Sequence, residues 1–207
     1  MTDLESVTAT TEPGAYVRSL PIGERIALPT GEETVTSWPN FPIEGELRLK
    51  VLDEPVLPEP PRSGEEGPET CHVCLRDPAD PEVLWQDEHW LVTAPVEPGG
   101  LPVEAMLYPR GHHDLADLPP ERSAELGPLL QRLERAVTAL GGIGRVHFNR
   151  WGDGAKHLHV WVIPRPEGML QLRGSFLPLW GDLLPKQSAE DWAETRGRLA
   201  ALLAADG

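Results

Sequence analysis

The clearest alternation of apolar and polar residues lies shortly after the middle of the chain. Two apolar-rich runs, 145–150 and 157–163, flank the segment 151–156, which contains Gly-Asp-Gly. Because Gly-Asp-Gly is typical of a turn, the pattern predicts a strand, a loop and a second strand. Successive side chains of a strand point to opposite faces. The face that should meet the core carries Leu158, Val160 and Val162. The other face carries His157, His159, Trp161 and Ile163, and two neighbouring imidazoles there indicate a site.

The same reading predicts the other elements of the main domain. Residues 83–86 and 90–93 form a hairpin pattern, and 103–108 form the next strand pattern. Apolar residues recur at helical spacing between 119 and 140, which predicts one long packed helix. A last helix is expected over 189–204. The chain is therefore expected to be α+β.

Composition along the chain suggests three parts. Residues 1–52 hold short strand-like pieces and predict an N-terminal β extension, partly mobile at its start. Residues 53–70 contain five prolines and six acidic residues, a composition typical of an extended linker. Residues 71–207 would form the main domain, with an apolar loop over 174–185.

Charge and length narrow the class of protein. The chain has 207 residues, 40% of them hydrophobic, which is enough for a globular core. Its net charge of −15 argues against nucleic-acid binding and against binding to anionic membranes. No apolar run has the length of a membrane span, and the first residues lack a secretory signal pattern. We expect a cytoplasmic protein.

The cysteines and histidines have the spacing of a metal site. Cys71 and Cys74 form a Cys-x-x-Cys pair, which suggests a metal or redox pair more than a structural disulfide. Zinc takes four Cys or His ligands in a tetrahedron. The chain offers these two cysteines, then His112 or His113, then His157. No thioredoxin-like βαβ pattern surrounds the cysteines, so a redox pair is the weaker alternative; two reduced cysteines in a turn are another.

The run from His157 to Ile163 resembles the motif of the histidine triad (HIT) superfamily, His-φ-His-φ-His-φ-φ, where φ is apolar. The resemblance covers about residues 71–180. A Cys-x-x-Cys, a hairpin, a strand and Pro109-Arg-Gly-His112 leading into a helix follow in the same order. The resemblance implies a HIT-like antiparallel sheet with one long packed helix, and the sequence pattern adds the C-terminal helix and the N-terminal β extension.

Some HIT branches, including galactose-1-phosphate uridylyltransferase, bind structural zinc through a Cys-x-x-Cys and two histidines. The matching ligands here are Cys71, Cys74, His112 and His157, with His113 as the alternative third ligand. The resemblance therefore implies structural Zn²⁺. Small HIT proteins are often dimers, which makes a homodimer an expectation as well.

His159 matches the middle histidine of the motif, the family's nucleophile. The resemblance implies a HIT-like hydrolase or nucleotidyltransferase that attacks a phosphate ester or anhydride and forms a covalent histidine intermediate. Five basic residues and two acidic ones lie between 145 and 173, which suits a small phosphorylated or nucleotide-like ligand. The expected ligand-binding residues are Asn149, Arg150, Gly152, Gly154, Lys156, Trp161 and Arg165.

Two departures from the HIT pattern support a second hypothesis. Trp161 replaces the third histidine and would stack on a base or, as we favour, fill the vacated space. Residues 91–95 lack the aspartate that in the family holds the ribose hydroxyls. The alternative is therefore a catalytically silent HIT-fold module that binds a phosphorylated ligand or a protein partner.

Overall fold

The computed structural model divides the chain into two compact units, residues 1–61 and 62–207. The residues that it describes are 21–24, 41, 43, 51–77 and 79–205. Within the first unit, Ile22 and Leu52 form an isolated parallel bridge. The expected N-terminal β extension lies mostly outside the described residues.

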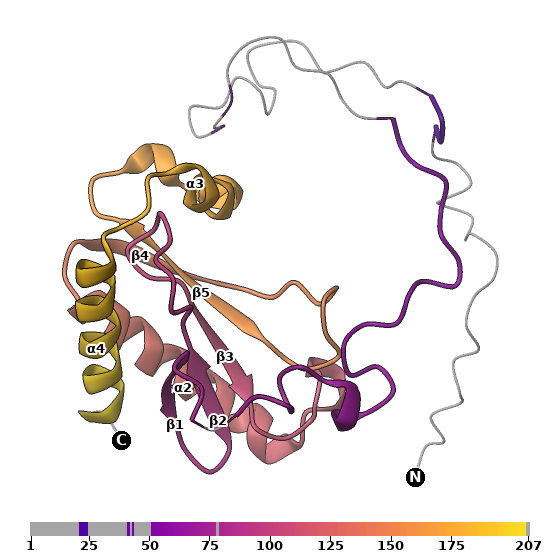
Figure 1. Cartoon of the computed structure of the whole chain (residues 1–207), viewed down its shortest axis with the longest axis horizontal. Coiled ribbons are helices and arrows are strands. Elements are labelled where there is room, and N and C mark those ends of the chain that lie inside the picture. Colours follow the sequence, from indigo (N-terminus) through magenta and orange to yellow (C-terminus); the bar gives the residue numbers. More distant parts are fainter. Residues whose placement is uncertain (1–20, 25–40, 42, 44–50, 78, 206–207) are drawn as a thin grey trace. The chain divides into compact units, whose positions relative to one another are not determined.

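A five-stranded antiparallel sheet forms the centre of the second unit (Figure 1). Its strands are β1 (Val83–Gln86), β2 (Trp90–Thr93), β3 (Ala105–Pro109), β4 (Ile143–Asn149) and β5 (Val160–Pro166). Their order across the sheet is β1-β2-β3-β5-β4, so β5, which follows the two motif histidines, lies between β3 and β4. The expected α+β fold with an antiparallel sheet is confirmed.

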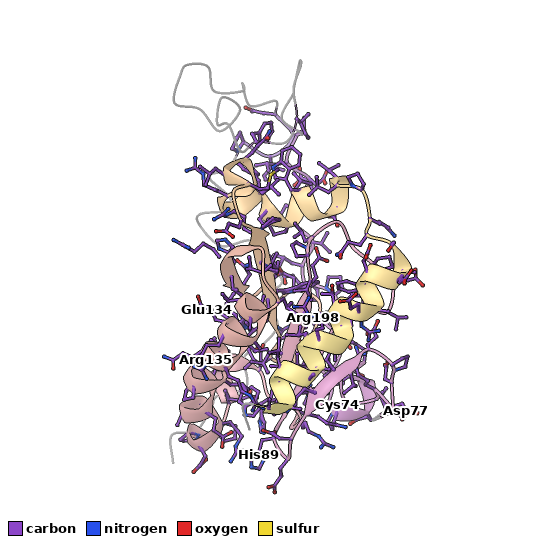
Figure 2. All side chains as sticks on the ribbon, turned by 90° about the vertical axis from the view of Figure 1, so that its left-hand side faces the viewer. Cys74, Asp77, His89, Glu134, Arg135 and Arg198 are labelled. Atoms are coloured by element: carbon purple, nitrogen blue, oxygen red, sulfur yellow. The ribbon has the colours of Figure 1, made fainter. Side chains whose placement is uncertain are left out.

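Helices complete the unit. The α-helices are α2 (Pro120–Ala139), α3 (Leu177–Leu183) and α4 (Ala189–Ala205). The 3₁₀ helices are η2 (Pro68–Thr70), η3 (Leu115–Asp117), η4 (Leu170–Leu172) and η5 (Gly174–Phe176). Figure 2 shows α2, where Glu134 and Arg135 are labelled, and α4, where Arg198 is labelled; the Arg198 guanidinium donates to the Leu140 carbonyl at 2.9 Å. Among the described residues, none of the helices has the length and apolar character that a bilayer crossing requires.

The main core lies between the sheet and the pair α2 and α4. It joins alternate residues of β2, β3 and β5 to the apolar stripes of the two helices. Leu133 on α2 and Leu199 on α4 are fully buried there. Burying each such leucine side chain contributes about 1.5–3 kcal/mol to the free energy of unfolding, relative to leaving it exposed. On the side of the sheet that faces the two helices, the core includes Val92, Leu107, Leu158, Val160 and Val162. The predicted core face of the second motif strand is thus confirmed.

The opposite face of the sheet carries two smaller apolar clusters. The first packs Cys71 and Val73 onto Leu91 and Tyr108, so it covers part of β2 and β3. The second groups Leu101, Leu172 and Leu177 around Ile163 of β5, with Trp161 at its margin. His159 is half-buried and belongs to neither cluster.

The structure differs from the sequence prediction in the second motif strand and in the segment 174–185. The second motif strand was expected over 157–163, but β5 runs from Val160 to Pro166. The ladder between β3 and β5 ends at the pair Leu107 and Val160, because β3 closes at Pro109, which has no N–H to donate. His157 and His159 therefore precede the strand. The segment 174–185, expected to be a loop, contains η5 and α3.

The segment 62–70, predicted as the end of the linker, makes specific contacts within the second unit. The Ser63 N–H donates to the Gly154 carbonyl at 3.2 Å, and the Lys156 N–H donates to the Ser63 carbonyl at 2.9 Å. This short parallel bridge fixes the loop before His157 against residues 62–64. Because residues 53–70 are rich in proline and acidic residues, their composition predicted an extended linker and did not predict these contacts.

Candidate metal centre and active site

Four side chains from three separate segments converge beside the sheet. Cys71 and Cys74 come from the turn after η2, His112 from the segment after β3, and His157 from the approach to β5. Their ligand atoms all lie within 4.8 Å of one another. The Cys71 Sγ to His157 Nδ1 distance is 3.4 Å, and Cys74 Sγ lies 3.3 Å from His112 Nδ1 and 3.5 Å from His157 Nδ1. A tetrahedral zinc site with S and N ligands has edges of about 3.3–3.8 Å. The cluster therefore has the size and donor set of a zinc site.

Hydrogen bonds orient both histidine rings with Nδ1 towards the cysteines. His157 Nε2 lies 2.8 Å from the Pro109 carbonyl, and His112 Nε2 lies 3.1 Å from the Gly64 carbonyl. A carbonyl can only accept, so in each ring Nε2 carries the proton and Nδ1 keeps its lone pair. This pattern of an outer hydrogen bond that fixes the tautomer is typical of metal-binding histidines.

Burial affects the acid–base chemistry of the cluster. Cys71 and His157 have no exposed surface. Burial, together with the hydrogen bond and charge of Cys71, raises the pKa of Cys74 to about 12. Burial lowers the pKa of His157, opposed in part by its hydrogen bond to Pro109. The histidine is thus neutral, as a ligand must be, and a bound cation would supply the positive charge that thiolates need at this depth.

Gly64 forms one wall of the cluster and was not identified from the sequence. Its φ is +78°, a conformation that side chains with a Cβ rarely adopt. A Cβ built there would lie 2.7 Å from Cε1 of His112 and 2.8 Å from Cβ of Cys71. Its carbonyl also accepts the His112 hydrogen bond. Gly64 belongs to a stretch read as a linker, and no motif in the sequence marks it.

We expect Gly64→Ala to weaken metal retention, because the new methyl group would displace His112 or Cys71. The expected loss of stability is about 2 kcal/mol or more, the range for strained backbone with a clash. Elemental analysis after dialysis and thermal unfolding measure the two effects. Gly197→Ala is the matched control: it lies in α4 with nothing within 4 Å of the added Cβ, and a helical Gly→Ala change stabilises by about 0.5–1 kcal/mol. Equal metal content in both variants would contradict this role of Gly64.

The two neighbouring histidines, His112 and His113, can be separated by experiment. The cluster contains His112, whereas the contacts found for His113 are made by its backbone, whose carbonyl accepts from the Leu158 N–H at 2.7 Å. We therefore expect His112→Ala to lose metal during dialysis and His113→Ala to retain it, because alanine preserves the backbone bond. Metal loss from His113→Ala alone would make His113 the ligand.

His159 lies beside the cluster but outside it. Its Nδ1 is 2.8 Å from the carbonyl of His157, so Nδ1 donates and Nε2 carries the lone pair. Nε2 has no hydrogen-bond partner among the described residues. The ring centroid of Tyr108 lies 6.4 Å from that of His159 and 6.2 Å from that of His157. Tyr108, which the sequence did not single out, thus lies next to both rings.

Two of the basic residues expected to bind a ligand are paired with carboxylates. Arg150 forms an ion pair with Asp114, and Lys156 Nζ lies 3.7 Å from a Glu65 oxygen. Arg62, another residue not identified from the sequence, bonds Asp114 at 3.3 Å and the Gly152 carbonyl at 2.8 Å. The arginines beside Asp114, aided by the Leu115 N–H, outweigh burial and lower its pKa. These contacts anchor the loop 151–156.

The other expected ligand residues lie in different places. Arg165 is buried and its Nη1 donates to the Pro166 carbonyl at 2.8 Å, so it stabilises the turn after β5. Trp161 packs at the margin of the second apolar cluster, and its ring centroid lies 6.0 Å from that of Trp151. Asn149 pairs with Trp161 across β4 and β5. The carbonyls of Gly152 and Gly154 accept hydrogen bonds from residues 62 and 63.

No family model matches the chain, and no curated protein matches it. Similar solved structures include a zinc-bound histidine triad family protein from Mycobacterium smegmatis, with 24% identity over 67% of this chain and 96% of that chain and a TM-score of 0.47. A hypothetical histidine triad nucleotide-binding protein from Sulfolobus tokodaii has 18% identity over 60% of this chain and 84% of that chain, with a TM-score of 0.45.

A uridylyltransferase mutant is also similar, with 22% identity over 66% of this chain, 47% of that chain and a TM-score of 0.46. The solved structures that resemble this chain thus include histidine triad proteins and uridylyltransferases. These TM-scores are below 0.5 and these identities below 25%, so the chemistry of this chain must be argued from its own side chains.

Proposed function

We propose that the chain is a hydrolase or transferase that acts on a nucleotide-like phosphate ester or anhydride, with His159 as nucleophile and structural zinc beside it. The observation that carries the proposal is the hydrogen bond from His159 Nδ1 to the His157 carbonyl at 2.8 Å. It leaves Nε2 of a half-buried imidazole as the nitrogen that can attack, and the neutral imidazole is the nucleophilic form of histidine. The motif His157-Leu-His159-Val-Trp161, which resembles the HIT motif, gives the reaction class.

The reaction would proceed in two displacements. His159 Nε2 attacks phosphorus, a P–N bond forms, and the bond from phosphorus to the leaving oxygen breaks with its electron pair on oxygen. Water or a second phosphate then attacks the same phosphorus and releases the imidazole. The loop before His157 would provide hydrogen-bond donors for the phosphoryl oxygens, because the amides of the accessible residues 152–154 donate no backbone hydrogen bond within the described residues.

Trp161 restricts the leaving group. An indole N–H is a donor that does not give up its proton, so this position supplies no general acid. A leaving group that is stable as an anion, such as the phosphate of an anhydride, needs no such acid. Phosphoanhydrides are therefore the favoured substrates, ahead of simple phosphate esters of alcohols.

The metal would be held by Cys71, Cys74, His112 and His157, a closed set of four protein ligands. Such a set leaves no position for substrate, so the ion would act as a structural crosslink. It joins the turn after η2 to the approach to β5. Since the carbonyl of His157 is the acceptor for His159, the crosslink also fixes the orientation of the nucleophile.

The proposal is tested by incubating the full chain with dinucleoside polyphosphates, nucleotide sugars and mononucleotide esters. Chromatography of the products is expected to show release from the anhydrides before the esters. An absence of turnover with every compound, combined with binding of one of them, would contradict the enzymatic proposal.

That outcome would support a second candidate, a catalytically silent module for a phosphorylated ligand. The observation that favours it is the pairing of Arg150 with Asp114 and of Lys156 with Glu65, which leaves less positive charge for a transferring phosphoryl group.

A further inference from the structure

A cavity of about 390 Å³ lies beside the proposed catalytic face, between β4 and the segment that leads into α3. Its lining residues are His147, Asn149, Trp151, Gly174, Ser175, Leu177 and Pro178. The volume falls within the usual range of small-molecule pockets. None of the lining residues is an acid, a lysine or an arginine.

The polar side chains of this cavity lack partners. Nε2 of His147 is buried, and the part of the chain that the structure describes offers it no hydrogen-bond partner. The side chains of Asn149, Trp151 and Ser175 likewise have no hydrogen-bond partner among the described residues. An unpaired buried polar atom is costly, so native structures rarely leave one without a protein, water or ligand partner. The buried Nε2 of His147 is the one group of the cavity to which this cost applies, and it indicates a partner inside the cavity. The more accessible side chains of Asn149, Trp151 and Ser175 add hydrogen-bond donors and acceptors around it.

The cavity adjoins the proposed nucleophile. Asn149, which lines it, is paired across the ladder with Trp161, and Trp151, which also lines it, contacts the Trp161 ring. Trp161 follows His159 by two residues, a separation of about 6.6 Å along an extended chain. A group attached to a phosphate at His159 can therefore extend into the cavity.

Apolar side chains cover other parts of the same sheet face. Cys71 and Val73 pack on Leu91 and Tyr108 and cover part of β2 and β3. Leu101, Leu172 and Leu177 cover the middle of β5 around Ile163. A cavity of about 150 Å³ lies beside the first of these clusters, where Val73 and Leu91 line it, so the cavity over β4 is the larger space of the two for the rest of a substrate.

We infer that this cavity binds an uncharged polar ring of the substrate, a pyranose or a nucleobase, while the attached phosphate lies at His159. The inference rests on the proposed function. The exposed indole of Trp151 provides a surface on which such a ring stacks, and His147, Asn149 and Ser175 provide its hydrogen bonds. The absence of charged lining residues selects against a charged ring.

Calorimetry on the full chain tests the inference with adenosine 5′-monophosphate, glucose 1-phosphate and inorganic phosphate. We expect at least one ring-bearing phosphate to bind at least about tenfold more tightly than inorganic phosphate, and the tighter of the two identifies the ring. His147→Phe should remove this advantage without changing inorganic phosphate binding. Ser175→Ala, at an exposed position where a folding defect is not expected, should reduce the advantage about two- to tenfold, the effect of one hydrogen bond.

His89→Phe is the matched control, because His89 lies at the turn of the β1–β2 hairpin, away from the cavity lining, and is labelled in Figure 2. The inference is overturned if both ring-bearing compounds bind no tighter than inorganic phosphate, or if His147→Phe and His89→Phe have equal effects. Adenosine and methyl glucoside separate the two proposals. If either compound binds in a way that depends on His147 and no phosphate compound binds, the result would support ring binding in the cavity. The same result would contradict the proposed phosphate chemistry.

Discussion

Replacing His157 by asparagine is expected to remove zinc and to destabilise the second unit together. His157 contacts both cysteine sulfurs, at 3.4 and 3.5 Å, and its ring is fully buried. Loss of a structural metal belongs to the small group of changes that cost about 4 kcal/mol or more. For a unit of this size that corresponds to a fall in Tm of about 10 °C. Elemental analysis and thermal unfolding measure both effects.

His72→Asn is the matched control for this prediction. His72 lies between the two cysteines in sequence, but its side chain is exposed and its Nδ1 lies 2.8 Å from Ser63 Oγ. We expect this variant to keep about one zinc ion per chain. A chelator should lower the Tm of the wild-type chain and leave that of His157→Asn unchanged. One zinc ion per chain in His157→Asn would show that this histidine is not a ligand.

His159→Asn should abolish turnover and leave the metal in place. The change removes the Nε2 lone pair that forms the P–N bond, and loss of a nucleophile lowers kcat by about 10³-fold or more. His159 is not in the metal cluster, and the hydrogen bond that its ring makes within the described residues goes to a backbone carbonyl. Zinc content should therefore stay near one per chain, and Tm should shift by less than about 4 °C, the effect of roughly 1 kcal/mol.

The contrast between the two asparagine variants is the informative result. His157→Asn loses activity through loss of the fold around the site, whereas His159→Asn loses activity in a folded, metal-bound protein. His89→Asn, at the β1–β2 turn, should behave as wild type in all three assays. Turnover that survives in His159→Asn would exclude this histidine as the nucleophile.

The sheet and its two large helices could be predicted because their signals are local. The apolar stripe of α2 and the alternation of residues 157–163 follow from side-chain periodicity, and the hairpin of β1 and β2 follows from two short apolar runs separated by a turn. The register of the histidines relative to β5 could not be predicted, because it depends on where Pro109 ends the ladder of the neighbouring strand. That is a property of two segments paired in space.

The convergence of Cys71, Cys74, His112 and His157 was predicted through a known spacing, but the surroundings of this cluster were not. Gly64 lies in a proline- and acid-rich stretch whose composition suggests a linker. In the structure this segment packs against the cluster and forms one wall of it. The ion pairs of Arg150 and Lys156 also depend on segments distant in sequence, at Asp114 and Glu65. Counting local charge therefore overstated the positive charge available to a ligand.

The cavity over β4 had no sequence signal. His147 and Asn149 share one face of a predicted strand, whereas Ser175 comes from the segment that was expected to be a loop. Only the folding of η5 and α3 over the sheet brings these residues together. Residues that contribute single hydrogen bonds from separate elements form no pattern along the chain.

The central claim is that His159 forms a covalent bond to phosphorus, and peptide mass spectrometry after an alkaline quench tests it most directly. The full chain is mixed with a phosphoanhydride from the panel, quenched within the first turnover and digested. The account predicts a nucleotidyl or phosphoryl mass on the peptide that contains His159, and fragmentation should place it on that residue. The mass should disappear after mild acid, as a P–N bond requires, and should be absent from His159→Asn. A modified residue elsewhere, or turnover without any adduct at His159, would contradict the account.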